Sequence, residues 1–250
     1  MAIFGRKKST PDEVEEVDVD EAPAAPEGQP GVDRDWDRPV DGPFDISERP
    51  DLSGRVDLGP LKIPAVKGME LRLDVEQGSN QVVGVTCTLA QSKIQLQAFA
   101  APKSRGVWSE IRPQIVEGLV NAGGQAEVVD GVLGKEVVAQ LPARTTDGRA
   151  VLQPARFLGV DGPRWFLRAV INGPAATSPQ ALPAIQTFVR LVVVDRGEEP
   201  RPPREVLHLS PPAEFVEEMN RRAAAAKAAK TAQASQRAAD LPGAEPDEQQ

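Results

Sequence analysis

Cysteine, histidine and tyrosine are nearly absent from this chain, which has one cysteine, one histidine and no tyrosine. A single cysteine, Cys87, excludes a disulfide within the chain. One cysteine and one histidine, His208, cannot supply the four ligands of a structural zinc site. A Ser/His/Asp or Cys/His arrangement would have to use His208, and no nucleophile turn accompanies it. We therefore expect no metal, no cofactor and no catalytic residue, and we interpret Cys87 as a small buried residue of an apolar strand.

Long apolar runs and nucleotide-binding motifs are also missing. No segment approaches the roughly 20 apolar residues of a membrane-spanning helix, and the start of the chain, Met1–Lys8, lacks the apolar stretch of a secretory signal. The segment Gly131–Lys135 matches a phosphate-binding loop poorly, because its spacing differs and Glu136 stands where Ser or Thr would contact magnesium. We therefore expect a cytoplasmic protein that is not an integral membrane protein.

Charge and apolar residues are distributed unevenly along the chain. The formal net charge is −8, of which residues 1–54 carry −9, residues 55–208 carry +3 and residues 209–250 carry −2. Low hydrophobicity with high charge does not offset the entropy of ordering a chain. We predict a disordered acidic arm over 1–54, in which Trp36 and Phe44 are the aromatic residues that could dock on the core. A folded domain over 55–208 follows, and then an Ala-rich helix that frays into a disordered tail over 209–250.

Hydrophobic periodicity predicts the order of the elements in the domain. Two-residue alternation is typical of strands, and spacing of three to four residues is typical of helices. A helix is expected from about Ser109 to Asn121, with Pro113 near its first turn. Two further helices are expected after Ser178 and after Ser210. The expected strands outside the central hairpins are Glu70–Val75, Gln81–Leu89, Lys93–Ala100 and Leu191–Asp195.

The chain contains three Asp-Gly pairs between apolar runs, at residues 130–131, 147–148 and 161–162. Asp-Gly is typical of tight hairpin turns, because both central residues of the favoured turn need positive φ. The pairs predict a meander of three strands, roughly Lys135–Arg144, Arg149–Val160 and Arg164–Asn172. Strands grouped in hairpins favour an α+β fold: a single antiparallel sheet of about seven or eight strands, with two or three helices packed against it.

The last strand of the meander has two unlike faces. One face carries Trp165, Leu167, Ala169 and Ile171 and is predicted to face the core. The other face presents Arg164, Phe166 and Arg168, a partly apolar surface with two arginines that could bind an anionic or acidic partner. The alternative interpretation is a solvated or helix-covered sheet face with salt-bridged arginines.

Arg156 is a fourth candidate binding residue. If Asp161-Gly162 is a two-residue turn, Arg156 lies opposite Leu167 on the apolar face. An arginine facing the core either extends its charged end to solvent at the sheet end or anchors another group. Arg156 would then add to the binding residues Arg164, Phe166 and Arg168.

Five segments occur together in this chain: the opening Met1–Arg6, then Asp41–Asp45, Arg55–Pro60, Gln97–Pro102 leading to Trp108, and Gly162–Arg168. As a set they resemble an actinobacterial family known as domain of unknown function thirty-seven-ten, over about residues 1–220. Family members often carry Trp where Phe44 stands. The resemblance implies no catalytic residues. It implies an antiparallel sheet-and-helix architecture, of a kind that mostly hosts binding or assembly roles.

Three functions remain open at this point. The favoured one is a non-catalytic binding or scaffold module that contacts protein partners through its sheet surface and tails. The alternative is a nucleic-acid-associated protein that uses a modest basic face, regulated by the acidic arm. The sequence supports this alternative only weakly, because the core carries a net charge of only +3 and has no tyrosine to stack on bases. An enzyme built on carboxylates alone would need a pocket lined by two or more convergent acids.

Overall fold

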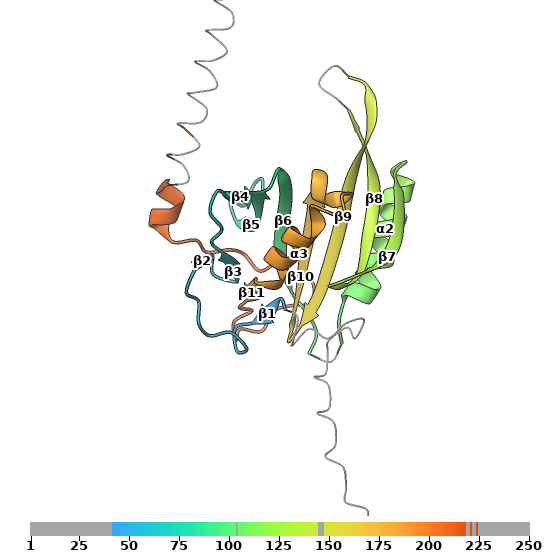
Figure 1. The fold of residues 1–250 in the computed structure, drawn as a ribbon. Coiled ribbons are helices and arrows are strands. Elements are labelled where there is room, and N and C mark those ends of the chain that lie inside the picture. The colour runs from blue at the N-terminus through green and yellow to red at the C-terminus, as the bar shows by residue number, and fades with distance from the viewer. Residues whose placement is uncertain (1–41, 104, 145–147, 219–220, 222–223, 225–250) are drawn as a thin grey trace, which may run out of the picture.

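The computed structural model describes residues 42–103, 105–144 and 148–218, together with residues 221 and 224. The two end segments that were predicted to be disordered lie largely outside the described residues. Figure 1 shows a large twisted sheet with a smaller sheet beside it. The elements are β1 (Phe44–Asp45), β2 (Arg55–Asp57), β3 (Leu61–Pro64), β4 (Glu70–Val75), β5 (Val82–Leu89), β6 (Ser92–Ala100), α2 (Trp108–Asn121), β7 (Gln125–Gly131), β8 (Gly134–Arg144), β9 (Ala150–Gly162), β10 (Trp165–Asn172), the 3-10 turn η1 (Pro174–Ala176), α3 (Leu182–Arg190) and β11 (Val193–Val194).

The larger sheet has seven strands in the order β4-β5-β6-β10-β9-β8-β7, and every neighbouring pair is antiparallel. The predicted meander is present as β8, β9 and β10, and β7 extends it to the sheet edge. The hairpin of β8 and β9 projects well beyond the other strands (Figure 1). Asp147, in the connection at its tip, lies outside the described residues. The predicted α+β class with an antiparallel sheet is confirmed.

The turn between β9 and β10 does not fall on its Asp-Gly pair. Gly162 pairs with Trp165, so Pro163 and Arg164 form the two-residue loop. Proline supplies the restricted φ of the first loop position, and Arg164 adopts a φ of +62° in the second. The prediction that Asp161-Gly162 forms this turn is wrong, because both residues belong to the end of β9.

The turn between β7 and β8 is displaced in the same way. Gly131 pairs with Gly134, which leaves Val132 and Leu133 in the loop. A Cβ atom added to Gly131 would lie 2.1 Å from the Oε1 atom of Glu136. Gly131 is therefore needed for the close approach of the Glu136 carboxylate to the backbone, and not for a turn with positive φ.

A second, four-stranded sheet in the order β1-β11-β3-β2 was not expected from the sequence. Its β1 runs parallel to β11, so the described fold begins before residue 55. Phe44 of β1 is 6% exposed, and the Oδ2 atom of Asp45 accepts a hydrogen bond from the indole Nε1 of Trp165 at 2.8 Å. Of its four strands, β11 lies within the expected strand Leu191–Asp195, whereas β1, β2 and β3 are two to four residues long and carry too little alternation to be recognised from sequence.

Two apolar clusters lie on the two faces of the larger sheet. The larger cluster lies under α3, whose Ile185, Phe188 and Val189 share one helical face and are almost completely buried. The predicted core residues Trp165, Leu167, Ala169 and Ile171 all belong to this cluster. The smaller cluster lies under α2 and is built around Trp108 and Phe166. Figure 1 shows α3 in front of β9 and β10 and α2 behind β7 and β8.

Candidate binding surface

Arg156 lies on the face of the sheet that α3 covers. It pairs with Ile171 of β10 and not with Leu167, so the predicted register is wrong although the predicted face is right. The Nη1 atom of Arg156 donates to Oε2 of Glu136 at 2.5 Å, and Gln186 of α3 donates to the other oxygen of Glu136 at 3.2 Å. The Glu136 side chain is 1% exposed. Arg156 therefore belongs to a buried polar cluster that ties β8, β9 and α3 together, away from the other candidate residues.

Phe166 lies on the opposite face, beneath α2. Its side chain is 1% exposed, and its ring stacks on the indole of Trp108 with 5.8 Å between ring centroids. Phe99 of β6 packs on it as well, also at 5.8 Å. Aromatic pairs at such separations add to the free energy gained by burial. For Phe166, the interpretation of a helix-covered sheet face is the right one.

The start of α2 is held on the sheet by Asp161. Its Oδ1 atom accepts a hydrogen bond from the backbone N–H of Val107 at 2.7 Å, and Oδ2 accepts one from Trp108 at 3.1 Å. The carboxylate thereby satisfies two N–H groups that a helix start leaves free, and its charge is favourable there. The Trp108 Nε1 donates to the carbonyl of Lys135 at 2.6 Å, and its ring lies directly on Gly159. The helix is thus fixed at its N-terminal end.

Arg168 lies beside the part of this face that α2 leaves open. Its guanidinium donates to the side-chain oxygen of Gln97 and lies 5.3 Å from the centre of the Phe99 ring. Its buried Nε atom has no hydrogen-bond partner, and no carboxylate of the described residues forms an ion pair with it. Burial lowers the pKa of Arg168 from its ordinary value, which means that the charged form is poorly solvated.

A small hollow of about 80 Å³ opens next to the Arg168 guanidinium. It is lined by Phe99, Val107, Ile111, Phe166, Arg168 and Arg204. Arg204 reaches this place because its backbone N–H donates to the carbonyl of Ala100 at 2.7 Å. Arg204 and Arg105 both form ion pairs with Glu110, at 2.7 and 2.5 Å. The hollow therefore has apolar walls, two guanidinium groups at its rim, and no acid in its lining.

The exposed Arg164 adds a third positive charge to those of Arg168 and Arg204, toward the end of the sheet. Its backbone carbonyl accepts a hydrogen bond from Ala101 at 2.8 Å, which places the β9–β10 turn beside the segment that leads into α2. Arg196 lies near Arg164 and Arg201; burial, and then these two positive charges, lower the pKa of Arg196. We call Arg164, Arg168, Arg196 and Arg204 the arginine surface.

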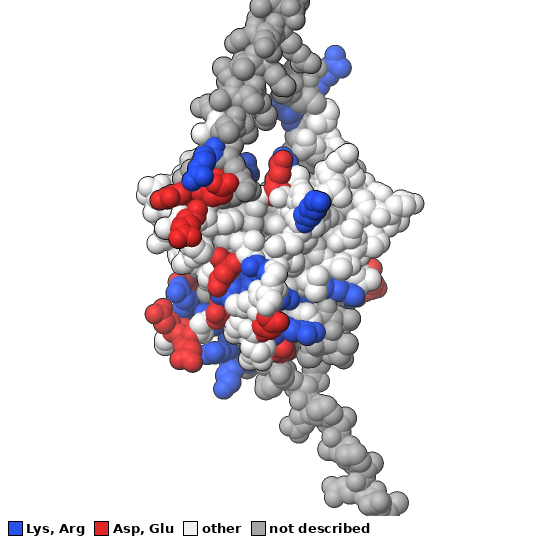
Figure 2. Space-filling view, turned by 60° about the vertical axis from the view of Figure 1, so that its left-hand side comes forward, with Lys and Arg blue, Asp and Glu red and all other residues white. Residues whose placement is uncertain are grey.

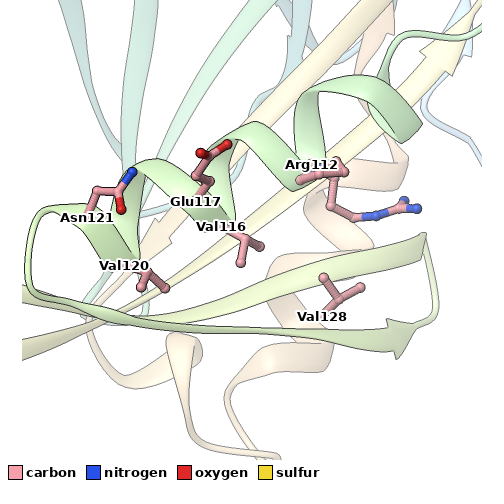
Figure 3. A pocket seen from close by; sticks show the side chains of 7 residues that line it. Arg112, Val116, Glu117, Val120, Asn121 and Val128 are labelled. Atoms are coloured by element: carbon pink, nitrogen blue, oxygen red, sulfur yellow. The ribbon is translucent and has the colours of Figure 1, made fainter.

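A second hollow, a groove of about 390 Å³, runs between α2 and the edge strand β7 (Figure 3). It is lined by Arg112, Pro113, Val116, Glu117, Val120, Asn121 and Val128. Nothing in the sequence pointed to it, because the groove depends on how α2 is placed over the sheet edge. Neither of the two hollows is lined by a pair of acids.

The described residues lack metal ligands grouped at one site, a reactive thiol and a membrane-spanning helix. They hold no group of three His, Cys, Asp or Glu side chains placed to bind a metal ion. Cys87 is buried in β5, and this burial raises the pKa of its thiol to about 12, which disfavours the reactive thiolate. No helix in this part of the chain has the length and apolar character needed to cross a membrane.

The face seen in Figure 2 carries lysine and arginine interspersed with aspartate and glutamate. Mixed signs on this face give no continuous basic stripe of the kind that binds nucleic acid.

Comparison with known proteins gives one match. A family model described as "Protein of unknown function (DUF3710)" matches residues 42–218, which include every strand and helix named above. No curated protein and no solved structure matches the chain.

Proposed function

The chain belongs to the DUF3710 family, as its sequence resemblance indicated, and we propose that it is a non-catalytic binding module that contacts an acidic segment of a protein partner through the arginine surface. The family description assigns no activity. We place this function in the cytoplasm, and the charged ends of the chain are part of the proposed contact region. The observation that supports the proposal most directly is the environment of Arg168.

Arg168 combines a desolvated charge with an open neighbouring space. A partly buried guanidinium without a carboxylate loses hydration that its bond to Gln97 does not replace in full. A carboxylate placed in the hollow would lie between Arg168 and Arg204 and would form charge-assisted hydrogen bonds. Arginine in a desolvated pocket with aromatic neighbours is also the residue environment that dominates binding energy at protein interfaces.

The lining of the hollow favours an acidic side chain of a protein over a nucleic-acid phosphate. Phe99, Ile111 and Phe166 give it apolar walls, which suit the methylene groups that carry a Glu or Asp carboxylate. Glu110 already neutralises part of the charge on Arg105 and Arg204, which lowers the field that a phosphate backbone would meet. The volume of about 80 Å³ admits a small side-chain group and not a base.

Binding of a fluorescent octaglutamate peptide, with octaglutamine as the neutral probe, tests the proposal by anisotropy. The double variant Arg164→Ala/Arg168→Ala should weaken octaglutamate binding at least tenfold. The matched control is Arg144→Ala/Arg149→Ala, which removes the same charge from the exposed tip of the β8–β9 hairpin and should leave binding unchanged. An equal loss of octaglutamate affinity in both double variants would mean that binding depends only on the net charge of the protein, and this result would refute the site.

A pull-down from cells with the same pair of variants then identifies the partner. Proteins retained by the wild type and by the hairpin control, but lost from the Arg164/Arg168 variant, are the expected partners. Identical partner sets for all three proteins would show that the surface has been wrongly chosen. Oligonucleotide binding that falls steeply with salt, and that is lost only in the Arg164/Arg168 variant, would favour the nucleic-acid function instead.

A further inference from the structure

The outer edge of β7 is a strand edge that the described chain leaves unpaired. β7 lies at the end of the strand order and pairs only with β8, through seven consecutive residue pairs without a bulge. An edge strand presents a row of N–H and C=O groups that can accept another strand. Proteins commonly block such edges with proline, lysine or a bulge, and Gln125–Gly131 contains none of these.

The groove between α2 and β7 adds an apolar surface to this edge. Val120 is 53% exposed and Val128 is 42% exposed, and Val116 lies between them along the groove (Figure 3). Exposed valines grouped beside an open edge are typical of a surface that another element covers. A covering strand would satisfy the β7 backbone and bury these valines at the same time.

A second copy of the same chain fits this edge in a definite register. A twofold axis perpendicular to the sheet at Val128 would place Val128 opposite the partner's Val128. Glu127 would then lie opposite the partner's Val129, and Asp130 opposite the partner's Ala126. No like charges stand directly opposite each other, which is the arrangement that would destabilise a strand pair.

The same axis would bring the two α2 helices together. An axis perpendicular to the sheet keeps both helices on one face, so they would run antiparallel over the seam between the two β7 strands. Arg112 lies in the N-terminal half of α2 and Glu117 in the C-terminal half, and both line the groove. Arg112 would therefore face the half of the partner helix that carries the partner's Glu117. Across the axis, Arg112 would thus lie near an opposite charge, and the valines of one groove would pack against those of the other.

We infer that the chain forms a symmetric dimer in which β7 pairs antiparallel with the partner's β7 and the two grooves close into one apolar seam. The charge order along α2 argues for this occupant over an unrelated peptide, because Arg112 and Glu117 would face the partner's opposite charges across the axis. The arginine surface lies on the other side of α2, so the dimer would leave the proposed acidic contact accessible.

Disulfide trapping in the full chain tests the register. In an antiparallel pair, directly opposed Cα atoms lie about 4.5–5.5 Å apart, which is within the range that a disulfide spans. Val128→Cys should therefore give a covalent dimer on mild oxidation, and the native thiol does not compete because Cys87 is buried. The matched control is Val75→Cys, at a valine of 52% exposure on β4, the opposite edge strand, which should stay monomeric on a non-reducing gel.

Sedimentation analysis tests the association without a cross-link. The wild type should have twice the chain mass of 26.8 kDa. Val128→Arg should weaken the dimer at least tenfold, because two arginines would oppose each other at the axis, and Val75→Arg should not. Mixing Val128→Arg with Val128→Glu should restore a heterodimer. Circular dichroism should show the same fold for every variant, since Val128 is half exposed.

A monomeric wild type at 100 µM or above would overturn the inference. So would a dimer that survives Val128→Arg, because its contact would then lie elsewhere. Failure of the acidic-peptide experiment would leave the dimer unaffected, since that experiment concerns residues on the other side of α2.

Discussion

Asp161, near the end of β9, accepts a hydrogen bond at 3.1 Å from the backbone N–H of Trp108, the first residue of α2. The aspartate is 2% exposed. The bond joins a strand to a helix 53 residues earlier in the chain and sets where that helix begins. The α2 position in turn shapes the hollow beside Arg168 and the groove above β7.

Asp161→Ala should lower the free energy of unfolding by about 2–3 kcal/mol, because it removes a helix cap and leaves buried N–H groups unsatisfied. Denaturant unfolding followed by circular dichroism measures the loss. Asp130→Ala is the matched control. Asp130 also precedes a glycine, but it is exposed and paired with Lys135 at the surface, so the loss in unfolding free energy should stay below about 1 kcal/mol. Equal costs for the two variants would deny Asp161 this role.

Gly159→Ala should displace the Trp108 ring. An added Cβ would lie 2.1 Å from the indole, and overpacking of this kind costs about 1–3 kcal/mol. Because the ring also backs Phe166, binding of the acidic peptide should weaken as well. Gly118 lies in α2, the helix that begins with Trp108; the Cβ atom of Gly118→Ala meets nothing within 4 Å, so this substitution should stabilise the protein by up to about 1 kcal/mol. Thermal unfolding and peptide anisotropy distinguish the two substitutions.

Arg156→Ala should be one of the most destabilising single substitutions in the domain. It leaves the carboxylate of Glu136 buried without its cation, and loss of one partner of a buried pair costs about 3–5 kcal/mol. Combining Arg156→Met with Glu136→Met should cost much less than the sum of the two single changes. A double-mutant cycle from urea unfolding measures this coupling, and additive single effects would contradict it.

The thiol of Cys87 should make stability decline at alkaline pH. Its pKa is raised from 9.0 to about 12 in the folded protein, so the folded state holds the proton more tightly than the unfolded state. The resulting stabilisation is complete below about pH 9 and decreases by up to about 1.4 kcal/mol per pH unit as the pH rises toward 12. Urea unfolding at pH 8 and pH 10 should show this decrease in the wild type, and a smaller decrease in Cys87→Val. The native thiol should also react slowly with a thiol reagent at pH 8 and rapidly after unfolding.

Alternating apolar residues were sufficient to locate most strands of the larger sheet. The alternation of Ile94, Leu96 and Ala98 predicted β6, and all three side chains are completely buried. The face of Trp165 and Leu167 was predicted for the same reason: a two-residue period is a property of consecutive positions and needs no knowledge of neighbours. The helical spacing after Trp108 also located α2, to within one residue at its start.

The roles of the residues at the candidate sites could be recognised only from the tertiary structure. Asp161 reads as a turn residue in the sequence, yet it caps a helix, because the register of β9 and β10 brings it beside Val107. Phe166 and Arg168 share one strand face and both line the hollow, and the placement of α2 decides that Phe166 is almost completely buried while the Arg168 guanidinium borders open space. Local pattern sets the secondary structure through sterics and burial of alternate side chains. Which distant groups meet depends on long-range pairing and helix placement, and these arise from the packing of the whole domain.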